Sequence, residues 1–362
     1  MDIRSSIAVV GMAGIFPGAF DADAFWTNIL SKFDATIDVP DHRWIEPVGR
    51  VVRPEPAIDR AVSRRGCLIE GFRFDPSGYR VAPELLTGLD PAHHLALHAG
   101  REALSRPEPL RLNKKRTGVI LAAIALPTDA SSAITRELFT GIFEQRLFGR
   151  HRFEPPSRIQ CAAARVTAFP AALLARALGL EGGSTTLDAA CASSLVAVKL
   201  ACDALHARRL DAVLAGGVSR PDCLYTQIGF SQLRALSPSG RCAPFDHRAD
   251  GLVVGEGAGI LVLKRLEDAI AGKDRILGLI RGIGVSNDMR GNLLAPDSEG
   301  QVRAMRSAYE QAGWDPGEVD LIECHGTGAP VGDVTELRSL LQLWGRGRRK
   351  TGSCAIGSVK SM

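Results

Sequence analysis

The chain has 362 residues, of which 45% are hydrophobic and 23% charged, so it can bury a large core as one domain or as two fused halves. The 44 Lys and Arg exceed the 40 Asp and Glu by too little, and too diffusely, to predict nucleic-acid binding. The 38 Gly and 20 Pro are spread along the chain, which argues against a disordered or low-complexity protein.

The first strand is expected at Ile7–Val10, followed by a helix that Asp21 or Asp23 can cap. The run Ile7–Phe16 is interrupted by glycines, so we interpret it as a buried strand and turn rather than a signal peptide. The patterning then predicts a surface excursion, a helix, a buried strand and a second helix. These span Val48–Arg65, Pro91–Leu104, Val119–Leu126 and Phe169–Leu178. Charged residues and a proline break the apolar run Ala162–Leu180, which predicts no membrane span.

Strands and helices continue to alternate in the second half of the chain. A capping box is expected at Ser298–Gln301, opening a helix that ends at Gly313. The other predicted strands are Asp211–Ala215, Gly259–Lys264, Ile276–Val285, Val319–Cys324 and Ala355–Val359, and the other helices are Arg265–Ala271 and Asp333–Leu343. Alternating elements of this kind indicate an α/β protein with mostly buried sheets.

The eight cysteines form no CxxC pair and have no zinc-ligand spacing, so no metal site is expected. They are Cys67, Cys161, Cys191, Cys202, Cys223, Cys242, Cys324 and Cys354. Reduced thiols of this kind are typical of a cytoplasmic protein. The glycine-dense stretch Gly251–Gly259 matches neither a Walker A loop nor a dinucleotide fingerprint, and close backbone packing is its expected purpose.

Cys191 stands where the apolar segment 184–190 gives way to a helical pattern. Leu195, Val198 and Cys202 recur at helical spacing, so Cys191 is predicted to begin an amphipathic helix. Free backbone N–H groups and the helix dipole at such a position favour an anion, and the thiolate is the nucleophilic form of cysteine. The alternative is that Cys191 is a small buried hydrophobic residue, as most cysteines are.

Three reactive or polar groups follow directly after predicted strands: Cys191, His325 and Lys360. Ligand sites in α/β proteins gather at the carboxyl ends of strands, so these residues could share one site. A cysteine with a histidine elsewhere in the chain is also the pattern of nucleophilic catalysis.

The ordered motifs of the chain resemble those of the β-ketoacyl synthase family of fatty-acid and polyketide synthases over essentially the full length. The matching segments are IAVVGMAGIFP, VPDHRW, DAACASSLVAV, LAGG, LRALSPSGRCAPFD, GEGAG, ECHGTGAPVG and GSVKS. The segments DAACASSL and SNDMRGNLLAP are most similar to those of ketosynthases from polyunsaturated-fatty-acid synthases and related iterative polyketide synthases.

This resemblance implies a thiolase-type α/β fold, in which two βαβ-rich halves stack as a five-layer α-β-α-β-α sandwich. The expected halves are residues 1–255, which carry Cys191, and residues 256–362, which are incomplete. The resemblance also implies a homodimer that works with an acyl carrier protein, an acyltransferase and other synthase domains. No cofactor would be bound, because substrates arrive on the phosphopantetheine of the carrier.

The resemblance assigns chemistry to particular residues. Cys191 would accept the acyl chain as a thioester, and its backbone N–H would help to form an oxyanion hole. A malonyl-type extender would then be decarboxylated, with His325 stabilising the developing negative charge. Lys360 would support the site and pair with Glu336. The remaining implied residues are Asp333 in support and Thr327, Ser193 and Phe230 in substrate binding.

Two departures from the family pattern affect these expectations. Ala329 replaces the last threonine of HGTGT, which removes a hydroxyl worth about 0.5–1.5 kcal/mol as a hydrogen bond. The sequence also ends at Met362, before the family's second catalytic histidine and final strands. It would be a fragment of a longer synthase or a shortened natural protein, and an exposed sheet edge is expected in either case.

The sequence leaves two classes of function open. One is a condensing acyltransferase, and the other is a condensation-inactive module that dimerises or docks the carrier. A Cys–His hydrolase is disfavoured, because the segment around Cys191 lacks protease motifs and the HGTG loop matches condensing enzymes better.

Overall fold

The computed structural model describes residues 6–105, 110–135, 139, 141–149, 169–291, 295–345 and 352–362. Cys161 and the first part of the apolar run Ala162–Leu180, residues 162–168, lie outside these ranges. Among the residues described, no helix combines the length and apolar character required to cross a lipid bilayer.

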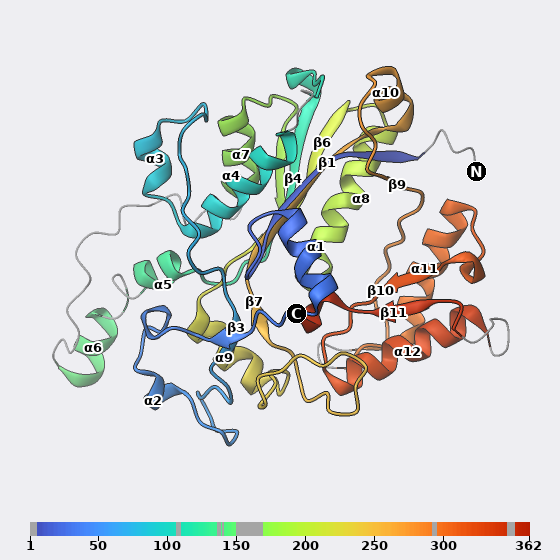
Figure 1. The fold of residues 1–362 in the computed structure, drawn as a ribbon. Helices are drawn as coiled ribbons and strands as arrows, with labels where there is room; N and C mark the ends of the chain where they lie inside the picture. Colours follow the sequence, from blue (N-terminus) through green and yellow to red (C-terminus); the bar gives the residue numbers. More distant parts are fainter. Residues whose placement is uncertain are drawn as a thin grey trace.

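A six-stranded mixed sheet dominates the fold, with strand order β5-β4-β6-β8-β1-β9 (Figure 1). Strands β5, β4 and β6 are parallel, whereas β8 runs antiparallel to both β6 and β1. The strands are β1 (Ile7–Ile15), β4 (Thr117–Ala123), β5 (Ser184–Leu187), β6 (Ala212–Ser219), β8 (Gly257–Arg265) and β9 (Gly278–Ile280).

Helices cover both faces of this sheet. Helices α4 (Pro91–Leu104) and α7 (Phe169–Leu178) pack on one face, and α8 (Ser193–His206) packs on the other (Figure 1). Strand β6 shows how the sequence produces this, because side chains alternate across a strand. Leu214 belongs to the core under α4 and α7, whereas Val213 belongs to the core under α8. The prediction of a sheet buried on both faces is confirmed.

The glycine-dense stretch brings two backbones together. A Cβ atom at Gly251 would lie 2.5 Å from the backbone nitrogen of Ser237. Only a residue without a side chain allows this approach, so close packing is confirmed as a purpose of Gly251.

Two smaller sheets complete the described fold. Strands β10 (Leu321–Glu323) and β11 (Ala355–Gly357) form a parallel pair near helices α11 (Ser298–Ala312) and α12 (Pro330–Trp344). Strands β2 (Ile37–Asp38), β3 (Arg65–Cys67) and β7 (Val254–Gly255) form a three-stranded sheet. The remaining α-helices are α1 (Ala22–Ser31), α2 (Val48–Val51), α3 (Pro83–Thr87), α5 (Asp129–Thr135), α6 (Gly141–Phe148), α9 (Cys223–Gln232) and α10 (Leu266–Ala271).

The mixed α/β class is confirmed, while the five-layer arrangement and the division after residue 255 stay predictions. Leu321 of β10 is 67% exposed and Ile356 of β11 is 42% exposed, so the small parallel sheet presents apolar side chains to solvent.

Several predicted boundaries differ from the structure. The capping box is wrong: α11 begins after Asp297, whose carboxylate accepts the Glu299 N–H at 2.8 Å. The helix therefore starts one residue earlier than predicted, with Asp297 and not Ser298 as the capping residue. The strand expected over 276–285 is limited to β9, because only residues 278–280 pair in register with β1. The excursion over 48–65 contains α2 and the start of β3.

His93 provides a test of the packing between α4 and α7. Its ring is buried and meets the Phe169 ring edge-on, with 5.0 Å between centroids. Burial lowers the pKa of His93 from the ordinary value of 6.5. The unfolded chain therefore binds more protons than the folded chain just below pH 6.5. The contribution of His93 to the free energy of unfolding is complete above this pH and is lost as the pH decreases.

Urea unfolding between pH 5 and 7.5 should show the free energy of unfolding decrease toward low pH, and the decrease should be smaller in His93→Gln. An equal decrease in the variant would show that His93 does not cause this pH dependence.

Candidate active site

Cys191 lies on a tight turn between β5 and α8. The strand ends at Leu187, a 3-10 turn spans Ala190–Ala192, and α8 begins at Ser193. The Cys191 side chain is exposed, so the alternative of a buried structural cysteine is wrong. Ala192 precedes the helix without a side-chain hydrogen bond to it, so the first helical N–H groups lack a capping side chain.

Side-chain hydrogen bonds hold this turn. The Ala190 N–H donates to Oδ1 of Asp188 at 2.9 Å, and the Ala189 N–H donates to Oγ of Ser193 at 2.8 Å. The Ser193 hydroxyl in turn donates to the Ala190 carbonyl at 2.6 Å. Ser193 is buried and bonded inside the turn, and its expected part in substrate binding stays a prediction.

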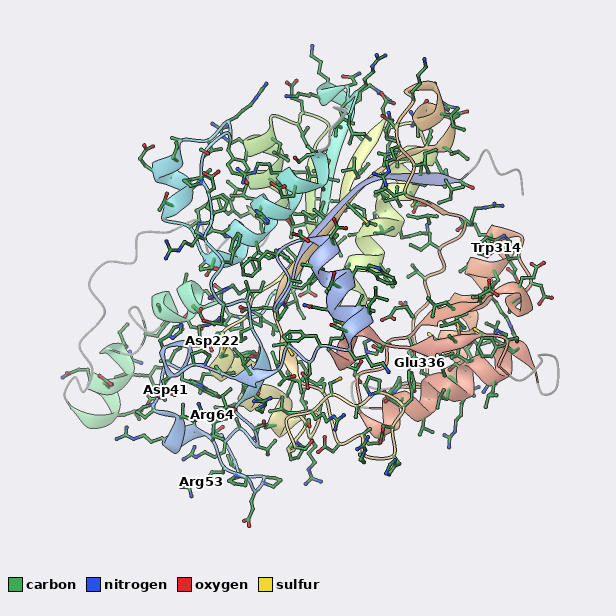
Figure 2. The ribbon with its side chains drawn as sticks, in the orientation of Figure 1. Asp41, Arg53, Arg64, Asp222, Trp314 and Glu336 are labelled. Atoms are coloured by element: carbon green, nitrogen blue, oxygen red, sulfur yellow. The ribbon has the colours of Figure 1, made fainter. Side chains whose placement is uncertain are left out.

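The loop that follows β10 carries His325. Glu336 of α12, labelled in Figure 2, holds this loop through its carboxylate. The carboxylate accepts the N–H groups of His325 at 2.7 Å and Gly326 at 2.9 Å. The predicted ion pair between Lys360 and Glu336 is wrong, because no ion pair of Lys360 occurs among the described residues. The Glu336 carboxylate is occupied by backbone donors instead.

Two glycines let the His325 loop pack closely. Gly326 and Gly328 have φ values of 35° and 76°, which favour glycine. A Cβ atom at Gly326 would lie 2.7 Å from Cβ of Ser358, next to β11. Between the glycines, Thr327 accepts the Ala329 N–H on its hydroxyl at 3.4 Å, and its carbonyl accepts the Cys242 thiol at 3.3 Å. The expected contact of Thr327 with substrate stays a prediction.

Lys360 and His325 are electrostatic neighbours, because parallel strands β10 and β11 end at the same edge of their small sheet. His325 is solvent-accessible, although protein atoms surround much of it. This partial burial, together with the charge of Lys360, lowers the pKa of His325 against the opposing carboxylates of Glu336 and Asp333. The imidazole is therefore neutral at neutral pH and can act as a hydrogen-bond donor.

Asp333 and Phe230 each accept hydrogen bonds from the backbone of a loop. Asp333 of α12 is buried, and its Oδ2 accepts the Phe245 N–H at 2.8 Å, where Phe245 has a positive φ of 59°. Phe230 is half-buried in α9, and its carbonyl accepts the N–H groups of Ala235 and Leu236. Asp333 thus positions a loop, while the proposed substrate contact of Phe230 stays a prediction.

The contacts form two groups. The Cys191 turn is one, and the loop of His325 with Glu336 and Lys360 is the other. Within the described ranges, no hydrogen bond or ion pair joins Cys191 to His325. The same ranges contain no cluster of three or more His, Cys, Asp or Glu side chains that could hold a metal ion.

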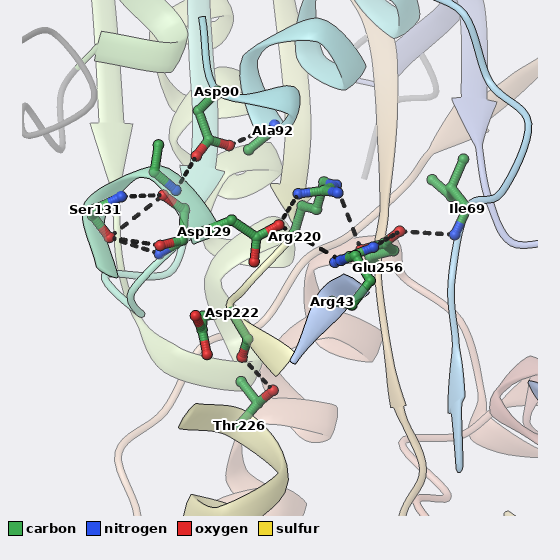
Figure 3. A network of polar contacts seen from close by, with 12 residues as sticks. Arg43, Ile69, Asp90, Ala92, Asp129, Ser131, Arg220, Asp222, Thr226 and Glu256 are labelled. Atoms are coloured by element: carbon green, nitrogen blue, oxygen red, sulfur yellow. Dashed lines mark hydrogen bonds and ion pairs between the residues drawn. The ribbon is translucent and has the colours of Figure 1, made fainter. Parts of the chain in front are cut away.

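A buried network of charges was missed by the sequence reasoning (Figure 3). Glu256, just before β8, has a side chain 1% exposed and accepts both terminal nitrogens of Arg43 at 3.3 and 2.9 Å. It also accepts the Ile69 N–H at 2.8 Å. Arg220, at the end of β6, lies 3.7 Å from Glu256 and donates to Asp129 at 2.8 Å. The sequence did contain one indication of this network: Glu256 lies among glycines directly before an apolar strand, where a buried carboxylate needs a positively charged partner.

Family models cover most of the chain. Residues 4–269 match "Beta-ketoacyl synthase, N-terminal domain" and residues 277–362 match "Beta-ketoacyl synthase, C-terminal domain". The mixed α/β fold is thus that of a ketosynthase-type, thiolase-like domain. The chain belongs to the β-ketoacyl synthase family, which confirms the resemblance inferred from the motifs.

Solved structures agree with this assignment. The chain superimposes on the "PfaC Keto synthase-Chain length factor" with a TM-score of 0.90 and 36% identity, over 98% of this chain and 39% of that one. The ketosynthase from module 6 of the bacillaene synthase from Bacillus subtilis gives a TM-score of 0.80 and 32% identity, over 98% and 57% of the two chains.

Curated relatives are much longer proteins. A mycocerosic acid synthase-like polyketide synthase from Mycolicibacterium smegmatis is 35% identical over 98% of this chain and 16% of its own length. A phenolphthiocerol/phthiocerol polyketide synthase from Mycobacterium tuberculosis is 34% identical, over 99% and 19%. The chain therefore spans less than a fifth of these relatives.

Proposed function

We propose that this chain catalyses acyl transfer to Cys191 followed by decarboxylative Claisen condensation, in fatty-acid or polyketide synthesis. The observation that carries the proposal is the exposed thiol of Cys191 on a tight turn at the start of α8, in a chain of the β-ketoacyl synthase family. The substrates are an acyl group and a malonyl-type extender, each bound to the phosphopantetheine of an acyl carrier protein.

The first step is thioester exchange. The Cys191 sulfur forms a bond to the acyl carbon, the bond to the pantetheine sulfur breaks, and the released thiol takes the proton. Cys191 is exposed on the turn that leads into α8, so its sulfur is open to the incoming carrier thioester. The backbone N–H of Cys191 is proposed to bind the oxyanion that forms on the acyl carbonyl.

The second step builds negative charge on the malonyl thioester oxygen as carbon dioxide leaves. His325 is proposed to donate a hydrogen bond to this oxygen, which its lowered pKa supports because the neutral imidazole carries one N–H. The carbanion then attacks the acyl carbon on Cys191. The new carbon–carbon bond replaces the bond to sulfur, so the Cys191 thiolate leaves and a 3-ketoacyl product two carbons longer forms. Lys360, Glu336 and Asp333 are proposed to support His325, and Thr327, Ser193 and Phe230 to contact substrate.

The proposal extends to assembly. We propose a homodimer that receives substrates from an acyl carrier protein and operates with acyltransferase and other synthase domains. Within the chain, residues 1–255 and 256–362 would form the two halves.

Intact-protein mass spectrometry after incubation with an acyl-carrier thioester tests the first step. One acyl mass is expected on the protein, and peptide mapping should place it on Cys191, because this thiol is exposed at the start of α8. Cys191→Ala should remain unmodified. Cys354→Ala removes another accessible thiol and should be acylated on Cys191 to the same extent as the unsubstituted protein. Acylation of Cys191→Ala to the same extent would disprove the assignment.

A second candidate function is a condensation-inactive module that dimerises or docks the carrier. Strand β5 favours it, because it lies at the edge of the six-stranded sheet and such an edge can pair with a strand of a second copy. This function predicts carrier binding unchanged by Cys191→Ala and no carbon dioxide release from a malonyl thioester.

A further inference from the structure

The Asp188 carboxylate joins the Cys191 turn to the neighbouring strand. Its Oδ1 accepts the Ala190 N–H at 2.9 Å, and its Oδ2 accepts the Ala125 N–H at 2.8 Å. Ala125 lies just beyond β4, which pairs in parallel with β5 up to the register Ala122–Leu187. The two oxygens therefore connect the ends of two adjacent strands at the point where Cys191 begins α8.

The residue before the nucleophile needs this support. Ala190 has a φ of 51°, in the left-handed region that costs a residue with a Cβ atom about 1–2 kcal/mol. A hydrogen bond from its N–H to a carboxylate stabilises that conformation, because bonds to charged groups are stronger than neutral ones. The strained residue, in turn, sets the direction in which the chain enters Cys191.

The far end of the tether is also anchored. The Pro127 carbonyl accepts the Asp222 N–H at 2.7 Å, and Asp129 is paired with Arg220 at 2.8 Å. The loop that offers the Ala125 N–H is thus attached to the end of β6 by two contacts. Asp188 consequently ties the Cys191 turn to the central sheet and not only to its own helix.

We propose that Asp188 is a positioning residue that holds Cys191 in the orientation required for acyl transfer. The inference rests on the proposed function, and it concerns a residue that contacts the peptide groups around the nucleophile rather than the substrate. The lowered pKa of Asp188, caused by the N–H groups of Ala125 and Ala190, agrees with a carboxylate that stays ionised at neutral pH.

Asp188→Asn tests the proposal, because an amide keeps the shape but places an NH2 group against one of the two N–H donors. We expect acylation of Cys191 by an acyl-carrier thioester to slow by about 10²-fold, as expected for a displaced reacting group. The rate at which iodoacetamide alkylates Cys191, measured by peptide mass spectrometry at a series of pH values, should also depend on pH differently from the unsubstituted protein. Circular dichroism should show a folded protein.

Asp75→Asn is the matched control. Asp75 is an exposed carboxylate that accepts the backbone N–H of Ser77, and it pairs with Arg101 on α4, across the sheet from α8. Loss of this similar bond should leave both rates unchanged. A folded Asp188→Asn variant with the acylation rate and alkylation profile of the unsubstituted protein would overturn the proposal.

A measurement on the unsubstituted protein covers the case in which Asp188→Asn fails to fold. The amides of Ala190 and Ala125 should exchange with deuterium slowly, although Ala190 and Ala125 are exposed, because both donate to Asp188. Exchange of both amides at the rate of unstructured peptides would overturn the proposal. If the unsubstituted protein is never acylated at Cys191, the proposed function fails, while the alkylation and exchange results still decide the role of Asp188.

Discussion

Replacing His325 with alanine is expected to lower the rate of malonyl decarboxylation by about 10²–10³, the cost of removing one donor from a site of developing negative charge. The acylation of Cys191 should continue at nearly its original rate, since the proposed role of His325 begins after that step. Carbon dioxide release from a malonyl-carrier thioester measures the first effect, and intact-protein mass spectrometry measures the second.

The structure makes this substitution specific. Glu336 holds the loop through the backbone N–H groups of His325 and Gly326, so an alanine side chain leaves those bonds in place. His247→Ala is the control, because His247 is exposed and contacts only the neighbouring Asp246 among the described charged groups. Equal carbon dioxide release from His325→Ala and the unsubstituted protein would exclude the proposed donor.

Replacing Glu256 with alanine is expected to reduce the free energy of unfolding by about 3–5 kcal/mol, the usual result of removing one partner of a buried ion pair. Burial alone would lower the pKa of Arg43, but the hydrogen bond and charge of Glu256 outweigh it and raise this pKa. Without Glu256 the guanidinium of Arg43, 5% exposed, would lose its main compensating charge. Urea unfolding monitored by circular dichroism measures the change.

Glu267→Ala is the control for this stability prediction. Glu267 pairs with Arg208 at the surface, where both side chains are about half exposed, so its removal should cost no more than about 1 kcal/mol. The double substitution Arg43→Met with Glu256→Leu should recover much of the stability lost in Glu256→Ala, since no charge then remains unpaired at that position. A Glu256→Ala protein as stable as Glu267→Ala would show that the network does not support the fold.

The sequence by itself determined the α/β class, the family and most of the elements. Helices Pro91–Leu104 and Phe169–Leu178 occur where predicted, and Cys191 and His325 each follow a strand as expected. These features are local: the period of apolar residues, the breaks at glycine and proline, and short motifs are all written within a few consecutive residues.

Only the tertiary structure decided how the site is held. Arg43 and Glu256 meet across 213 positions of sequence, and Asp188 reaches Ala125 across 63. Glu336 was expected to pair with Lys360, yet its oxygens accept the backbone of the His325 loop. Which partner a charged side chain finds depends on how distant strands and loops are placed in space, and a local pattern of residues carries no information about that placement.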